Sequence, residues 1–103
     1  MNPMYTETAM TREERFRKIT LMLKKRGAKR IAIFGSYARE EESTRSDIDV
    51  MVAFAERKTL LELVRIEREL SEALGIKVDL VTEKFISPYL IEGIRNQMKV
   101  IYG

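Results

Sequence analysis

The sequence predicts an α+β domain, with a small mixed β-sheet of three to four strands and helices packed mainly on one face. Apolar runs of strand length occur near residues 31–34, 50–52 and 76–82. Two Thr-x-x-Glu capping boxes, which begin at Thr11 and Thr59, each precede apolar residues at helical spacing. Strands and helices that alternate in this way are typical of a sheet covered by helices.

The 103 residues suit one domain with a single modest core. Residues 1–10 contain Pro3, scattered methionines and no periodicity, so we expect a flexible N-terminal tail before a single domain over 11–103. A hydrophobic share of 45% and a charged share of 34% describe a soluble globular protein. No apolar run approaches the length of a membrane span, and the N-terminus lacks a signal-peptide core. We therefore expect a cytoplasmic protein without membrane attachment.

The chain has no cysteine and no histidine. Disulfides, thiol chemistry, histidine acid–base catalysis and His-ligated zinc are therefore excluded within this chain. Any catalysis must rest on carboxylates, metal ions and cationic side chains. The net charge of +3 and the pI near 9.3 suit a phosphate-bearing substrate or an acidic partner.

The first helix should run from the Thr11 box to about Arg26, with Gly27 just past its end. Basic residues cluster where this helix ends, and they complement the helix dipole there in the simplest interpretation. Contact with phosphate or RNA is the alternative, but no aromatic residues interleave to stack bases, so direct nucleic-acid binding is unlikely. The cluster comprises Lys24, Lys25, Arg26, Lys29 and Arg30.

The stretch from Ile31 to Val52 carries the strongest chemical pattern. An apolar run stops at Gly35-Ser36, and ten residues separate Ser36 from Asp47-Ile48-Asp49. Residues i and i+2 of a strand point to one face, so Asp47 and Asp49 should stand side by side and favour a divalent cation between them. Gly35 permits a sharp turn, and Ser36 begins a short helix whose free N–H groups suit a phosphate.

Each half of this pattern also has an ordinary interpretation. Gly-Ser after a strand is most often only a turn, and Asp-x-Asp is common at a solvated strand start. Both elements lie at strand ends, however, in an order and spacing that would bring them together. The combination therefore suggests nucleotide chemistry.

The second helix should run from the Thr59 box to just before Gly75, and residues 76–82 should form a third strand. Strand–helix–strand order predicts a right-handed crossover and parallel pairing. Asp79 lies mid-strand between Val78 and Leu80, where an unpaired buried carboxylate is costly. It either joins Asp47 and Asp49 on the neighbouring strand, or faces water or a cation such as Lys77.

Ser87-Pro88 predicts the start of a third helix, and Lys99 to Tyr102 a short terminal strand. Leu61, Val64 and Tyr89 lie outside the apolar stripes of the helices. They are either partner contacts or scattered surface residues.

The spacing of Gly35-Ser36 and Asp47-Ile48-Asp49 resembles the signature of the DNA polymerase β-like nucleotidyltransferase superfamily. Two motifs resemble its minimal, MNT-type branch in particular, namely Gly35-Ser36-Tyr37-Ala38-Arg39 and Ser46-Asp47-Ile48-Asp49-Val50. The resemblance covers roughly Thr11 to Tyr102. The branch often has glycine where Glu40 stands, and the run Glu40-Glu41-Glu42 makes this loop unusually acidic.

The resemblance implies Mg²⁺-dependent transfer of AMP from ATP. Asp47 and Asp49 would hold one or two Mg²⁺, with Asp79 as third ligand and candidate general base. Gly35 and Ser36 would bind the β- and γ-phosphates. Arg39 would neutralise developing charge, unless it is a solvated arginine paired with residues 40–42. Ser46 would cap or orient the aspartate loop.

The resemblance also implies a partner, because MNT proteins work beside a helical HEPN-domain toxin and transfer AMP onto one of its tyrosines. Nearly all of the chain belongs to the catalytic core, so we expect the acceptor to come from such a partner. One alternative is a non-catalytic antitoxin that neutralises the toxin by binding. Another is a nucleotidyltransferase that acts on a small molecule or RNA.

Overall fold

The fold is a four-stranded sheet covered by two helices, as the computed structural model describes it for residues 10–43, 47–83, 92–93 and 97–103. This arrangement confirms the predicted α+β class. The elements follow one another as α2 (Arg12–Lys25), β1 (Ala28–Phe34), the 3₁₀ turn η1 (Gly35–Tyr37), β2 (Ile48–Phe54), α3 (Leu60–Leu74), β3 (Val78–Thr82) and β4 (Lys99–Tyr102).

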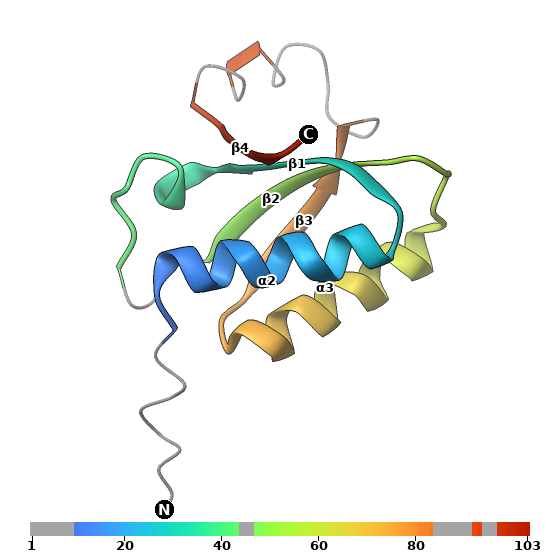
Figure 1. Cartoon of the computed structure of the whole chain (residues 1–103), viewed down its shortest axis with the longest axis horizontal. Helices are drawn as coiled ribbons and strands as arrows, with labels where there is room; N and C mark the ends of the chain where they lie inside the picture. The colour runs from blue at the N-terminus through green and yellow to red at the C-terminus, as the bar shows by residue number, and fades with distance from the viewer. Residues whose placement is uncertain (1–9, 44–46, 84–91, 94–96) are drawn as a thin grey trace, which may run out of the picture.

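The strand order across the sheet is β3-β2-β1-β4 (Figure 1). Strand β1 is antiparallel to both of its neighbours, whereas β2 and β3 are parallel, as the intervening helix predicts. The predicted terminal strand is also present as β4. Strand β3 begins at Val78, two residues later than expected, because Gly75 ends α3 in a left-handed conformation (φ 71°) and Ile76 and Lys77 complete the turn.

Both helices begin at the capping boxes that the sequence predicts. The Thr11 side chain accepts a hydrogen bond from the Glu14 amide, and the Glu14 carboxylate accepts one from the Thr11 amide at 2.8 Å. Thr59 and Glu62 repeat the arrangement at the start of α3. These hydrogen bonds lower the pKa of both glutamates because they favour the ionised carboxylate.

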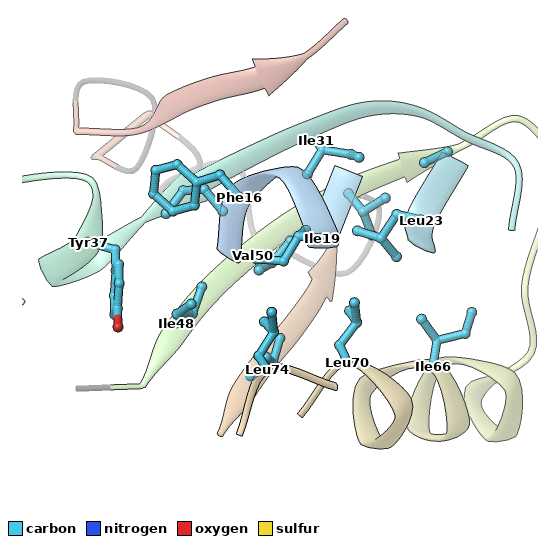
Figure 2. Close-up of a cluster of buried hydrophobic side chains, with 14 residues drawn as sticks. Phe16, Ile19, Leu23, Ile31, Tyr37, Ile48, Val50, Ile66, Leu70 and Leu74 are labelled. Carbon is cyan, nitrogen blue, oxygen red and sulfur yellow. The ribbon is translucent and has the colours of Figure 1, made fainter. Parts of the chain in front are cut away.

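The hydrophobic core lies between the two helices and one face of the sheet (Figure 2). Alternate residues of β2 point into this core, so its second residue, Asp49, points to the opposite face. The contributors to the core include Phe16, Ile19 and Leu23 from α2, Ile31 and Ile33 from β1, Ile48, Val50 and Val52 from β2, and Ile66, Leu70 and Leu74 from α3.

Some expectations fall outside the part of the chain that the structure describes. These are the tail over residues 1–9, the helix start at Ser87-Pro88, and Tyr89. Within the described ranges, no helix combines the length and the apolar character needed to cross a bilayer.

Replacing Leu70 by alanine should lower the free energy of unfolding by about 2–5 kcal/mol, because it removes a fully buried side chain and leaves a cavity. Leu61 lies on the same helix with 78% of its surface exposed, so Leu61→Ala is a matched control that should change stability little. Chemical denaturation of both variants measures the difference. Equal losses would contradict the packing of α3 described above.

Candidate active site

Gly35 forms a sharp elbow between β1 and the 3₁₀ turn. Its φ of +74° is a conformation that side chains disfavour, and its carbonyl accepts hydrogen bonds from the Ala38 and Arg39 amides at 3.1 and 3.2 Å. A Cβ atom at this position would lie 3.3 Å from Asp49 Cγ and would overlap the Asp49 carboxylate oxygen. Glycine is therefore required twice, by the backbone conformation and by the carboxylate beside it. The short helix expected after Ser36 is a single 3₁₀ turn.

Asp49 and Asp79 are exact neighbours across the parallel pair β2–β3. Phe34, the last residue of β1, lies opposite Asp49 on the other side. Burial raises the pKa of Asp49, and the negative charge of Asp79, a hydrogen bond between the two side chains and the charge of Asp47 raise this pKa further. The two carboxylates are thus held against each other although they repel.

Asp47 and the nearest cations complete the surroundings of this pair. Asp47 is exposed and acts on Asp49 through its charge. Arg39 has the opposite effect and lowers the pKa of Asp49, although its guanidinium also donates to Glu41 at 3.0 Å. Lys77 Nζ lies 3.8 Å from Asp79, and both side chains are largely solvated. Arg39 therefore both acts on Asp49 and pairs with Glu41. Asp79 likewise lies both beside Asp49 and near Lys77, so for each residue the two arrangements that the sequence left open occur together. Ser46 lies outside the described residues.

Two carboxylates in contact need a proton or a cation between them, and the oxygen-only donor set is the kind that Mg²⁺ prefers. Among the described residues, no three carboxylates lie close enough together to surround one metal ion. Asp47 acts on Asp49 only through its charge. The Asp49–Asp79 pair fits a divalent cation for two reasons. Their repulsion would be relieved, and Gly35 keeps the space beside Asp49 free of a side chain.

The residues that hold the turn in place carry no pattern in the sequence that would have predicted them. Tyr37 is buried, and its backbone carbonyl accepts a hydrogen bond from the Arg12 guanidinium. Its hydroxyl accepts one from Arg15 Nη1 at 3.1 Å, and its ring packs edge-on against Phe16 (Figure 2). Arg12 also forms an ion pair with Glu42 at 3.3 Å. The first turns of α2 thus clamp the segment after Gly35 at two points, Tyr37 and Glu42.

Glu40 has a φ of +59°, and it is the only non-glycine residue with a positive φ in the described ranges. A side chain in this left-handed conformation costs about 1–2 kcal/mol relative to glycine. This explains why glycine suits the position at which the sequence departs from the branch that it resembles. In this chain the contacts of Arg39 with Glu41 and of Arg12 with Glu42 hold the loop in shape.

A mixed sheet whose first strand ends in a Gly-Ser elbow, beside paired aspartates on the next two strands, defines a nucleotidyltransferase core. Residues 13–101 match the nucleotidyltransferase domain family, which spans most of the chain. The chain belongs to this family, as the sequence resemblance indicated.

Within this family, the chain is similar in sequence to relatives that are named as protein adenylyltransferases. It is 52% identical over 81 residues to a proposed protein adenylyltransferase of Methanocaldococcus jannaschii, covering 79% of this chain and 87% of that protein. It is 38% identical over 72 residues to the protein adenylyltransferase MntA of Thermococcus cleftensis, covering 70% and 73% of the two chains. The names of both relatives describe the same activity, protein adenylyl transfer.

Solved toxin–antitoxin structures contain a chain with a similar fold. A toxin–antitoxin structure with AMP-PNP superposes with a TM-score of 0.79 at 29% identity, covering 85% of this chain and 73% of that chain. A tri-AMPylated Shewanella oneidensis HEPN toxin in complex with its MNT antitoxin gives a TM-score of 0.76 at 26% identity, covering 90% and 73%. These similarities confirm the family, the MNT branch and the fold.

The Asp49→Asn variant should raise the thermal unfolding midpoint by a few degrees in metal-free buffer at neutral pH. An ionised Asp49 opposes folding because its pKa is raised from the ordinary 3.8, so the gain should vanish as acid protonates it. Mg²⁺ should then stabilise the natural protein more than the variant. Calorimetry with and without Mg²⁺ measures both effects, and Glu72→Gln is the exposed control. A lower midpoint for Asp49→Asn without metal would contradict the repulsion.

The Arg12→Gln variant should loosen the loop after Gly35. A lost hydrogen bond from a charged group is worth about 1.5 kcal/mol, so amide exchange at Ala38, Arg39 and Glu41 should accelerate roughly tenfold. Arg17→Gln, an exposed arginine on the same helix, should leave exchange unchanged. If Arg12→Gln instead accelerated exchange evenly through the sheet, the clamp would be a general stabilising contact.

Proposed function

We propose that this chain is a Mg²⁺-dependent protein adenylyltransferase that transfers AMP from ATP to a tyrosine hydroxyl of a HEPN-domain toxin. The proposal rests above all on one observation, the Asp49–Asp79 carboxylate pair packed against the Gly35 elbow. That arrangement has a structural cost, because it holds two like charges together, as is typical of sites shaped for catalysis.

The residues of the chain have distinct roles in this reaction. Asp47, Asp49 and Asp79 would hold one or two Mg²⁺. When bound, Mg²⁺ supplies positive charge to the triphosphate and lowers the pKa of the attacking hydroxyl. The amide groups that open the turn at Ser36 have no partner within it and would receive the β- and γ-phosphates.

The chemical step exchanges one phosphorus–oxygen bond for another. The tyrosine oxygen forms a bond to the α-phosphorus, and the bond from that phosphorus to the bridging oxygen breaks, so pyrophosphate leaves. The hydroxyl proton passes to a carboxylate, for which Asp79 is the candidate because its side chain is 41% exposed and reachable by an acceptor. Arg39 lies close enough to influence Asp49 and would offset the negative charge that develops on the phosphates. We assign Ser46 the role of orienting the aspartate loop.

The acceptor is inferred from the relatives. Of the two relatives described above, one is named a protein adenylyltransferase and the other a proposed one. Two solved neighbours are toxin–antitoxin structures, one with a tri-AMPylated HEPN toxin and the other with AMP-PNP. Nearly all of the described residues belong to the catalytic core, which leaves little surface to bind and orient a large acceptor. A folded partner that docks on the chain and presents its own tyrosine would position the acceptor without such a surface.

The test combines the purified chain, a candidate HEPN-domain partner sought among the neighbouring genes, labelled ATP and Mg²⁺. We expect label on the partner with the natural chain, and a loss of at least about a thousandfold with Asp47→Asn/Asp49→Asn, because the charges that would hold Mg²⁺ are gone. Glu13→Gln/Glu72→Gln removes the same number of carboxylates, both exposed and outside the cluster, and should retain transfer. Tyrosine-to-phenylalanine variants of the partner then locate the acceptor.

The alternatives predict different outcomes when RNA and candidate small-molecule acceptors are added to the same reactions and the toxic activity of the partner is measured beside the label. If the aspartate variant silences the partner as well as the natural chain does, and no label moves, the protein neutralises its partner by binding alone. If label appears on RNA or on a small molecule instead, the acceptor assignment is wrong, although the nucleotidyltransferase assignment stands.

A further inference from the structure

A cavity of about 600 Å³ lies at the end of the sheet away from the aspartates. Its apolar wall comes from Ala53, Phe54 and Ala55, at the end of β2 and just beyond it. Along this strand, Val52 and Phe54 lie three and five residues beyond Asp49, which corresponds to about 10 and 17 Å. The cavity is therefore separate from the candidate active site.

The cavity carries excess positive charge. Three cations line it, namely Lys29, Arg57 and Lys58, and none of them forms an ion pair with another described residue. Of the two carboxylates in its wall, Glu83 is paired with Arg30 at 3.4 Å. Two carboxylates remain to oppose the three cations: Glu56 in the wall, and Glu62 outside it, whose pKa is lowered by its capping hydrogen bonds and in part by the charge of Lys58. Clusters of like charge that outnumber their counterions favour an anionic ligand.

The fold brings these cations together from two separate segments. The Ala55 amide donates to the Gly27 carbonyl at 2.9 Å, which fixes the connection between β2 and α3 against the turn between α2 and β1. Figure 1 shows this end of the sheet opposite η1. The basic cluster after α2 thereby gains Arg57 and Lys58. Lys58 is oriented by the Phe54 ring, whose centroid lies 5.4 Å from Nζ.

We propose that this cavity is a second binding site, for a small phosphate-bearing molecule of about nucleotide size. The phosphate lies among Lys29, Arg57 and Lys58, and the remainder of the ligand covers the apolar wall formed by Ala53, Phe54 and Ala55. The volume is within the range of about 300–1,000 Å³ that is typical of small-molecule sites. Free phosphate, pyrophosphate and a mononucleotide share this chemistry, and the experiment distinguishes them.

The experiment is an NMR titration of ¹⁵N-labelled protein with 5′-AMP, pyrophosphate and inorganic phosphate, separately, in buffer with EDTA. We expect saturable shifts at the amides of residues 52–58 and 82–83. The Arg57→Gln/Lys58→Gln variant should weaken this binding about tenfold or more. Lys24→Gln/Lys25→Gln removes the same charge from the same end of the molecule but outside the cavity, and it should bind nearly as well as the natural protein.

Comparing the three ligands shows which kind of phosphate-bearing molecule the cavity binds. Tighter binding of AMP than of both inorganic ions would identify a nucleotide site that uses the apolar wall, whereas equal binding would identify a phosphate site alone. The proposal is overturned if shifts occur only near residues 35–39, if no ligand produces saturable shifts at residues 52–58, or if both double variants weaken binding equally. A Lys29→Gln variant, on a different segment, gives an independent check and should also weaken binding.

Discussion

The register of β2 is the constraint on which the rest of the structure depends. Side chains alternate between the faces of a strand, so burying Ile48, Val50 and Val52 against the helices forces Asp49 onto the opposite face. A slip of one residue would bury Asp49 and expose the three core residues, which is energetically prohibitive. The core therefore positions the carboxylate. The parallel pairing with β3 then brings Asp79 beside it.

This arrangement places stabilising and destabilising interactions on opposite faces of one strand. On the helix side, fully buried aliphatic residues from α2, α3 and the sheet pack together. On the other side, Asp49 is held against Asp79 and against Gly35, where no side chain fits. The hydrophobic face outweighs the repulsion, so the pair persists in the folded chain. A site of this kind is preorganised because the fold, and not the ligand, brings its charges together.

The sequence predicted most of the fold because its signals are local or periodic. The Thr11 and Thr59 capping boxes, the turn glycines and the alternation in β2 each depend on residues close in the chain. Asp79 was predicted as a neighbour of Asp49 only because the intervening helix implies parallel strands. The clamp by Arg12 and Arg15 on Tyr37 was not predicted, since it joins residues more than twenty positions apart and no periodicity marks it. The same holds for the meeting of Arg57 and Lys58 with Lys29.

The acidic run after the Gly35 turn has a specific explanation in these contacts. Three successive glutamates near a phosphate site would repel the ligand if all three faced it. Glu41 instead accepts a hydrogen bond from Arg39, and Glu42 forms an ion pair with Arg12. Glu40 is exposed and takes the left-handed conformation that lets the chain turn between them. Two of the three carboxylates thus order the arginines that hold or border the turn, so the loop is acidic in sequence while much of its charge is locally compensated.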